Sequence, residues 1–190
     1  QRRGLNRTIN AEAKRLVHLV NDYLDLARLE SDARPLHLTP VRMATLVERA
    51  LTLLEPIALQ RGIRLVRRFA PNLPALLADA DLIAQAVNNL VANAIKFSPE
   101  KSEVIIEARA EGDAVLIEVA DRGPGIPPES RERIFEKFYR VPRLADADAP
   151  GTGLGLTFVR EVAERHGGSV AVESETGVGS TFTLRLPIKA

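Results

Sequence analysis

The chain has 190 residues, enough for one ordinary domain together with a helical appendage. Hydrophobic residues make up 45% of it, so a core can form, and its formal net charge of +1 gives no bulk attraction to nucleic acid or to a membrane surface. Cysteine is absent, which excludes disulfides and thiolate metal sites, and no apolar run reaches the ~20 residues of a membrane span.

The N-terminal segment, residues 5–30, is predicted to form one long helix. Its apolar residues recur at spacings of three and four and give a broad stripe, which is typical of a helix in a bundle. They are Leu16, Val17, Leu19, Val20, Tyr23, Leu24, Leu26 and Ala27. Residues 31–35 end this helix. Because Gln1 already lies in helix-like sequence, we expect the chain to be a fragment of a longer protein.

The rest of the chain interleaves strands with helices and predicts an α+β fold, a two-layer α/β sandwich in which a mixed sheet carries helices on one face. The predicted strands are 36–41, 63–70, 168–174 and 180–188, with a hairpin across 103–121 that turns at Gly112-Asp113. The predicted helices are 42–61, a helix capped by Asp79 or Asp81 that ends near 98–100, a short one at 129–137, and 154–166. On the short helix, Phe135 and Phe138 are expected to anchor the core.

The helix that contains "NNLVANAIKF" has a second, polar face. At ~100° per residue, Asn89, Asn93 and Lys96 fall in one arc, opposite the apolar side. A solvated face is one interpretation, but such faces usually carry Glu, Lys and Arg. Two amides beside a lysine favour a site for Mg²⁺ and phosphates, because Mg²⁺ prefers oxygen ligands and an ammonium neutralises phosphate charge.

Two glycine-rich stretches also carry polar groups. "DRGPGI" (121–126) follows a strand, so its glycines allow a tight turn and close approach of a ligand, and the Asp121 carboxylate can accept a hydrogen bond from an exocyclic amine. "PGTGLGL" (150–156) precedes a helix and offers backbone amides to an anion, although it is neither a Walker A sequence nor G-x-G-x-x-G. A structural turn and a flexible hinge loop are the respective alternatives.

The order of these motifs closely resembles the sensor histidine kinases. An Asn-rich helix, D-x-G-x-G-I, I-F-E-x-F-Y-R, G-T-G-L-G-L, H-G-G and a final G-S-T-F hairpin are similar to the N box, glycine boxes and F box of their catalytic and ATP-binding domain. That domain belongs to the GHKL ATPase superfamily, with a Bergerat-type sandwich. The resemblance implies two domains: residues 1–34, the second helix of the dimerisation and histidine-phosphotransfer hairpin, and residues 35–190, the catalytic and ATP-binding domain.

The resemblance also implies a site for ATP and Mg²⁺. Asn93 matches the Mg²⁺ ligand, Asp121 the acceptor for the adenine amino group, and Arg140 a phosphate-side arginine. Residues 141–153 match the mobile ATP lid. The full set implied is Asn89, Asn93, Lys96, Phe97, Asp121, Gly123, Gly125, Ile126, Arg140, Gly151, Thr152, Gly153, Leu154 and Gly155.

The family's phosphoacceptor motif, H-[ED]-x-[RT]-P, is absent from this chain. His18 is expected on a helix surface or interface, and His37 in a strand near the surface. His166 is expected to end a helix, where a cation suits the helix dipole. No catalytic residue is therefore assigned, and we expect the chain to bind ATP without phosphorylating itself.

The resemblance implies a protein-histidine kinase fragment that serves phosphotransfer to a histidine and relay to a response-regulator receiver domain. A homodimer is expected in the full-length protein, a cytoplasmic location for this fragment, and membrane contact only through segments outside it. The alternatives are a GHKL-type ATPase or a non-catalytic nucleotide-binding dimer module. Hydrolytic relatives carry a glutamate one turn before the N-box asparagine, where this chain has Asn89. A nucleic-acid role has no support, since basic stripes and aromatic platforms are missing.

Overall fold

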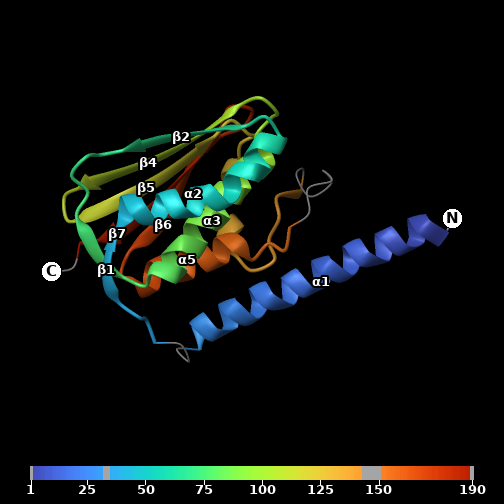
Figure 1. The fold of residues 1–190 in the computed structure, drawn as a ribbon, viewed down its shortest axis with the longest axis horizontal. Coiled ribbons are helices and arrows are strands. Elements are labelled where there is room, and N and C mark those ends of the chain that lie inside the picture. Colours follow the sequence, from blue (N-terminus) through green and yellow to red (C-terminus); the bar gives the residue numbers. More distant parts are fainter. Residues whose placement is uncertain (1, 32–34, 143–150, 189–190) are drawn as a thin grey trace.

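The computed structural model describes residues 2–31, 35–142 and 151–188. Helix α1 (Arg2–Glu30) is a long rod, and its C-terminal part lies beside a sandwich formed by the rest of the chain (Figure 1). In the part of the chain that is described, no helix combines the length and the apolar character that crossing a bilayer requires.

The main sheet has five strands in the order β2-β4-β5-β7-β6. Its strands are β2 (Arg64–Phe69), β4 (Glu103–Glu111), β5 (Ala114–Asp121), β6 (Ser169–Glu175) and β7 (Gly179–Pro187). β2 runs parallel to β4 and the other pairs are antiparallel, so the predicted mixed sheet and both predicted hairpins are confirmed.

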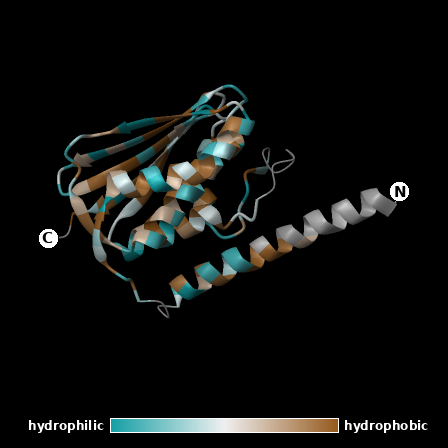
Figure 2. Cartoon of the chain, in the orientation of Figure 1, coloured by the Kyte–Doolittle hydropathy of each residue, from teal (hydrophilic) through white to brown (hydrophobic). Residues whose placement is uncertain are grey.

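Three helices cover one face of this sheet: α2 (Met43–Gln60), α3 (Ala80–Phe97) and α5 (Gly155–Arg165) (Figure 1). Apolar and polar residues alternate along the strands in Figure 2, because successive side chains of a strand point to opposite faces. The inward set, including Val104, Ile106 and Ile117, is buried against the helices. Ion pairs such as Arg68–Glu107, at 2.9 Å, lie among the exposed and half-buried residues.

A second, small sheet was not predicted in full. β1 (Thr39–Arg42) pairs antiparallel with β3 (Ala75–Ala78), and β3 was missed. Its four residues follow a proline-broken segment and carry no alternation of their own, so only the pairing with β1 reveals the strand. The segment 129–137 also differs from its prediction, since it forms two single-turn 3₁₀ helices, η1 (Pro128–Ser130) and η2 (Arg133–Phe135).

The prediction that Phe135 and Phe138 are both core anchors is half right. Phe135 is buried, and its ring meets Phe182 edge-on with centroids 6.5 Å apart. Phe138 is 52% exposed, so the prediction for it is wrong. The physical reason is that η2 ends at Phe135: Glu136 is extended, with ψ 148°, and Phe138 adopts a left-handed backbone with φ 63°. The helical spacing therefore does not reach Phe138.

The start of α3 is fastened to the end of α5. Asp79 caps α3, since its Oδ1 accepts a hydrogen bond from the Leu82 N–H at 3.2 Å. The Asp79 N–H donates to Nε2 of His166 at 3.0 Å, and the His166 Nδ1–H donates to the Val162 carbonyl at 2.7 Å. The prediction that His166 ends a helix is confirmed, since His166 is the C-cap of α5. One ring nitrogen accepts and the other donates, as in a neutral imidazole, so hydrogen bonds and not a positive charge hold the ring there. His166 is buried and joins the two helices.

Candidate functional site

A cavity of about 390 Å³ lies at one end of α3, where it meets the turn after β5 and the loop before α5. All the residues predicted for the nucleotide site except Gly123 and Leu154 line this cavity. The fold therefore brings together an asparagine face, a glycine turn and a glycine loop that are far apart in the sequence. Residues 143–150, the greater part of the segment predicted as a lid, lie outside the described residues.

The polar face of α3 forms one wall. Asn89, Asn93 and Lys96 line the cavity, while Leu90 and Val91 on the other side of the helix are fully buried. The predicted two-faced helix is thus present. The Lys96 ammonium lies 4.6 Å from the ring centroid of Phe97.

The Lys96 ammonium on this wall is partly buried and therefore partly desolvated. Burial lowers the pKa of Lys96, and the positive charge of Arg140 lowers it further. Both side chains line the cavity. An anionic ligand would stabilise the charged form of Lys96 again, so this part of the cavity is suited to phosphates.

The Asp121 carboxylate, at the close of β5, also lines the cavity. Its Oδ1 accepts a hydrogen bond from the Gly123 N–H at 2.7 Å. Burial raises the pKa of Asp121, and backbone hydrogen bonds from Gly123 and Ser180 partly offset that rise. Gly123 does not line the cavity, but a Cβ there would lie 2.8 Å from Asp121 Oδ1 and 3.0 Å from the Phe97 carbonyl oxygen. Glycine at 123 lets the backbone hold the carboxylate.

The glycine turn is braced by the β6–β7 hairpin. Gly125 has φ +70°, and a Cβ on it would lie 2.0 Å from the Glu175 carbonyl oxygen. The next residue, Ile126, donates its N–H to Ser174 Oγ at 2.7 Å, and that hydroxyl also lies 2.9 Å from Ser180 Oγ. Close backbone packing against this hairpin therefore requires glycine at 125, in addition to any role toward a ligand.

The loop before α5 contacts the asparagine helix. A Cβ on Gly151 would lie 2.7 Å from Lys96 Nζ, and one on Gly155 would lie 3.3 Å from Asn89 Oδ1. Gly153 has φ +73° and packs on the backbone of Phe138, whose N–H donates to the Gly153 carbonyl at 3.0 Å. Leu154 is 1% exposed and points into the core, so it anchors the loop and does not line the cavity.

Several lining residues were missed by sequence reasoning. They are Asp22, Ala92, Pro124, Ile134, Tyr139, Leu156, Ser180 and Phe182, whereas Val141, which also lines the cavity, is the first residue of the predicted lid. Most are apolar neighbours of predicted residues and belong to the same motifs. Asp22 is different, because it comes from α1 and its Oδ2 accepts a hydrogen bond from Thr152 Oγ1 at 3.0 Å. No local pattern links two residues 130 positions apart.

Of the three histidines, His37 and His166 do not line the cavity. His37 is exposed and precedes β1 instead of lying in a strand, and its N–H donates to Asp79 Oδ2 at 3.1 Å. His166 is buried at the α3–α5 junction. His18 lies within α1, and its side chain is outside the described part of the structure.

The donor set fits a Mg²⁺ ion that arrives with a polyphosphate. Among the described residues, no group of three or more His, Cys, Asp or Glu side chains could hold a metal alone. Asn93 offers a neutral amide oxygen on the cavity wall. Mg²⁺ commonly takes one or two ligands from protein and the remainder from phosphate and water, so a single amide here is chemically sufficient.

Comparison with known proteins identifies the sandwich. Residues 78–190 match the model of the family described as histidine kinase-, DNA gyrase B-, and HSP90-like ATPase. The chain is 42% identical over 176 residues to the sensor-like histidine kinase SenX3 of Mycobacterium tuberculosis, covering 93% of this chain and 43% of that protein. It is 40% identical to the sensor protein IrlS of Burkholderia pseudomallei, covering 94% of this chain and 38% of that protein. The chain spans less than half the length of these curated relatives.

Solved structures share the same arrangement. The crystal structure of full-length ShkA in complex with AMPPNP matches with a TM-score of 0.85 and 35% identity, covering 99% of this chain and 39% of that one. The histidine kinase ThkA, solved in complex with the response regulator protein TrrA, matches with a TM-score of 0.77 and 26% identity, covering 95% of this chain and 49% of that one. These matches extend across α1 as well as the sandwich.

Proposed function

Because the chain belongs to the family of histidine kinase-, DNA gyrase B- and HSP90-like ATPases and contains the ATP-binding domain of a sensor histidine kinase, we propose that it serves transfer of the ATP γ-phosphoryl group to a histidine outside this chain. The phosphoryl group would then pass to an aspartate of a response-regulator receiver domain. ThkA, solved with a response regulator, supports such a partner.

One observation carries this proposal: a single cavity is lined by the Asp121 carboxylate, by two cations and by the Asn93 amide. The Asp121 carboxylate can accept a hydrogen bond from the adenine amino group. Lys96 and Arg140 can neutralise the phosphates, and Asn93 can ligate Mg²⁺. A site with these properties distinguishes adenine by its exocyclic amine and holds the polyphosphate by charge.

Phosphoryl transfer needs mainly positioning and charge neutralisation, which these residues would supply. The nucleophile would be an imidazole nitrogen that attacks the γ-phosphorus while ADP leaves. His166 is poorly suited to this role, since both its nitrogens are engaged in hydrogen bonds at a buried junction. Hydrolysis is disfavoured because the position one turn before Asn93 is Asn89, and an amide is no general base.

The remaining assignments are proposals of the same kind. Residues 1–34 would be the second helix of a dimerisation and phosphotransfer hairpin, which would form a homodimer in the longer protein. Exposed Leu16, Val17 and Val20 on α1 support a helix that packs against others. We place the domain in the cytoplasm, with membrane contact through other segments.

The test is phosphotransfer in two parts. The chain should bind Mg·ATP in calorimetry and remain unlabelled when incubated with γ-labelled ATP. Adding a dimerisation hairpin with an acceptor histidine should place the label on that hairpin, in the acid-labile form expected of phosphohistidine. A hairpin whose histidine is replaced by glutamine is the control. Absence of nucleotide binding, or label on this chain at His18 or His166, would contradict the proposal.

A further inference from the structure

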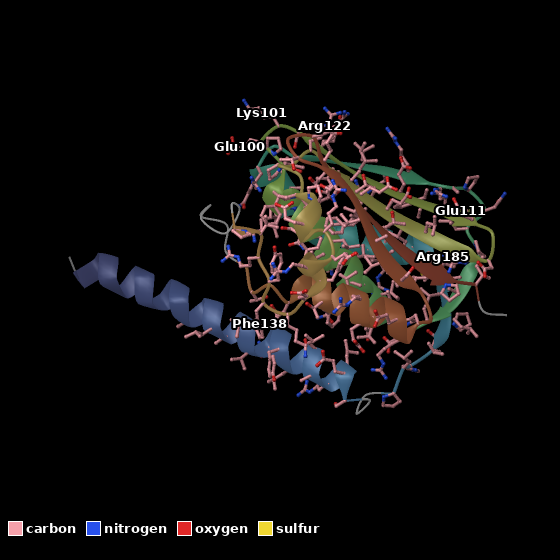
Figure 3. All side chains as sticks on the ribbon, turned by 180° about the vertical axis from the view of Figure 1, so that it is seen from behind. Glu100, Lys101, Glu111, Arg122, Phe138 and Arg185 are labelled. Atoms are coloured by element: carbon pink, nitrogen blue, oxygen red, sulfur yellow. The ribbon has the colours of Figure 1, made fainter. Side chains whose placement is uncertain are left out.

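The C-terminal part of α1 is packed firmly against the sandwich. Leu26 and Leu29 are each 1% exposed, so both are removed from water by the domain. Arg165 at the end of α5 donates to the Leu29 carbonyl at 3.2 Å, and Lys137 pairs with Glu30 at 2.7 Å. These contacts fix α1 beside the loops that border the cavity, as Figure 3 shows for the labelled Phe138.

One turn earlier, α1 reaches the cavity itself. Tyr23 stacks on Phe138, with ring centroids 6.4 Å apart and planes inclined by 21°. Asp22 lines the cavity and accepts the hydrogen bond from the Thr152 hydroxyl at 3.0 Å. The exposed Phe138, which fails to anchor the core, is thus partnered by the helix.

The position of Asp22 matters because of its charge. Among the described residues that line the cavity, only Asp22 and Asp121 are acidic. Asp22 accepts a hydrogen bond from Thr152, which directly follows Gly151, and a Cβ on Gly151 would lie 2.7 Å from Lys96 Nζ. A carboxylate is therefore held at the end of the cavity suited to phosphates, where it would repel them.

We propose that docked α1 makes the site discriminate against the terminal phosphate of ATP, because Asp22 occupies the Thr152 hydroxyl and adds negative charge where that phosphate would lie. This inference rests on the proposed function. A diphosphate carries less charge toward Asp22 than a triphosphate, so docking of α1 favours ADP over ATP. By reciprocity, ATP weakens the docking of α1 more than ADP does.

The first experiment compares Asp22→Asn with Asp25→Asn in the 190-residue chain. Asparagine at 22 keeps an oxygen that can accept from Thr152 and removes only the charge. Asp25 is on the same helix but does not line the cavity, so it is the matched control. We expect Asp22→Asn to raise affinity for Mg·ATP about three- to tenfold and for Mg·ADP less than about twofold, as removal of one nearby charge allows. Asp25→Asn should change neither.

The second experiment measures docking directly. Because the chain has no cysteine, Tyr23→Cys together with Phe138→Cys provides a single pair for a short thiol crosslinker. Mg·ATP should slow crosslinking more than Mg·ADP does, and the difference should shrink when Asp22→Asn is added.

The possible failures are distinguishable. If the wild-type chain binds neither nucleotide, the proposed function fails. If it binds both, and Asp22→Asn changes their affinities equally or not at all, the nucleotide site stands and this inference is overturned. Equal slowing of the crosslink by both nucleotides also overturns it.

Discussion

The parts of the cavity wall around Asp121 and around Lys96 are built differently. At the Asp121 end, the carboxylate is fixed by a backbone N–H, and the turn that follows is wedged against the β6–β7 hairpin so closely that no side chain fits at Gly125. Around Lys96, the groups are long side chains, a glycine loop and Asp22, which belongs to α1. The surroundings of Asp121 are preorganised by the sheet, and those of Lys96 depend on how the side chains and α1 are arranged.

This difference separates two tasks. A rigid carboxylate suits selection of one base, because a misplaced partner would leave a buried polar group unpaired. An end assembled from charges and a docked helix suits adjustment, because its affinity for phosphate changes whenever one charge moves. Selection of the base by Asp121 would then be constant, whereas the affinity of the site for the phosphates would be regulated.

The largest expected effect is at the Lys96 end. Asn93→Ala should lower the affinity for Mg·ATP by about 100-fold or more, since even the outer-shell partners of metal ligands cost ~10–100-fold when lost. The fold should be unaffected, because Asn93 is only partly buried on the cavity wall. Calorimetric titration in the presence of Mg²⁺ measures the change.

Asn88→Ala is the matched control for that variant. Asn88 is the same residue type on the same helix and does not line the cavity. Its affinity for Mg·ATP should equal that of the wild type. If Asn93→Ala binds Mg·ATP as tightly as Asn88→Ala does, Asn93 is not the Mg²⁺ ligand.

A smaller effect is expected at the Asp121 end. Asp121→Asn should weaken ATP binding by about tenfold or more, because a hydrogen bond to a charged group contributes ~1.5–3 kcal/mol. An amide has one acceptor oxygen in place of two, and Gly123 already requires one of them. The loss should be selective for the base: purine riboside triphosphate, which lacks the exocyclic amine, should bind both proteins similarly. If purine riboside triphosphate loses as much affinity as ATP does, Asp121 does not recognise the exocyclic amine.

The smallest effect is a proton linkage. Burial and Arg140 hold the pKa of Lys96 below 10.5 in the free protein, and bound phosphates would raise it again. At pH values between the pKa of Lys96 in the free protein and its higher pKa in the complex, the complex binds more protons than the free protein, so nucleotide binding takes up a proton and weakens as pH rises.

Calorimetry at alkaline pH, in buffers that differ in ionisation enthalpy, would report an uptake of less than about one proton. Lys96→Gln should abolish that uptake. An uptake that persists in the variant would show that another group is responsible and that Lys96 does not face the phosphates.

Local patterns predicted most of the fold. The two hairpins and α3 follow from alternation, turn residues and a two-faced helix, all of which lie within a few residues of each other. β3 was missed because four residues pair with β1 across the intervening helix α2 and strand β2. The prediction for Phe138 failed because helical spacing was extended past Glu136, where the backbone becomes extended.

In the candidate site too, residues within short motifs were predicted, and a residue brought in by tertiary packing was not. Asn93, Asp121 and the glycines belong to short motifs, so the sequence indicates them directly. Asp22 carries no such signal, since an aspartate on the polar side of a helix is ordinary and only the docking of α1 brings it to Thr152. Leu154 was assigned to the site because it stands inside a glycine motif, although its side chain packs in the core.

The hydrogen bond between Asp79 and His166 also sets an order of assembly. It joins residues 87 positions apart, and it acts on the residue that caps the asparagine helix. Contacts so distant in sequence are closed late, since loop closure must precede their benefit. During synthesis, α3 can therefore begin to form long before its first turn receives this last hydrogen bond. The asparagine helix becomes fully anchored only after residue 166 has emerged from the ribosome.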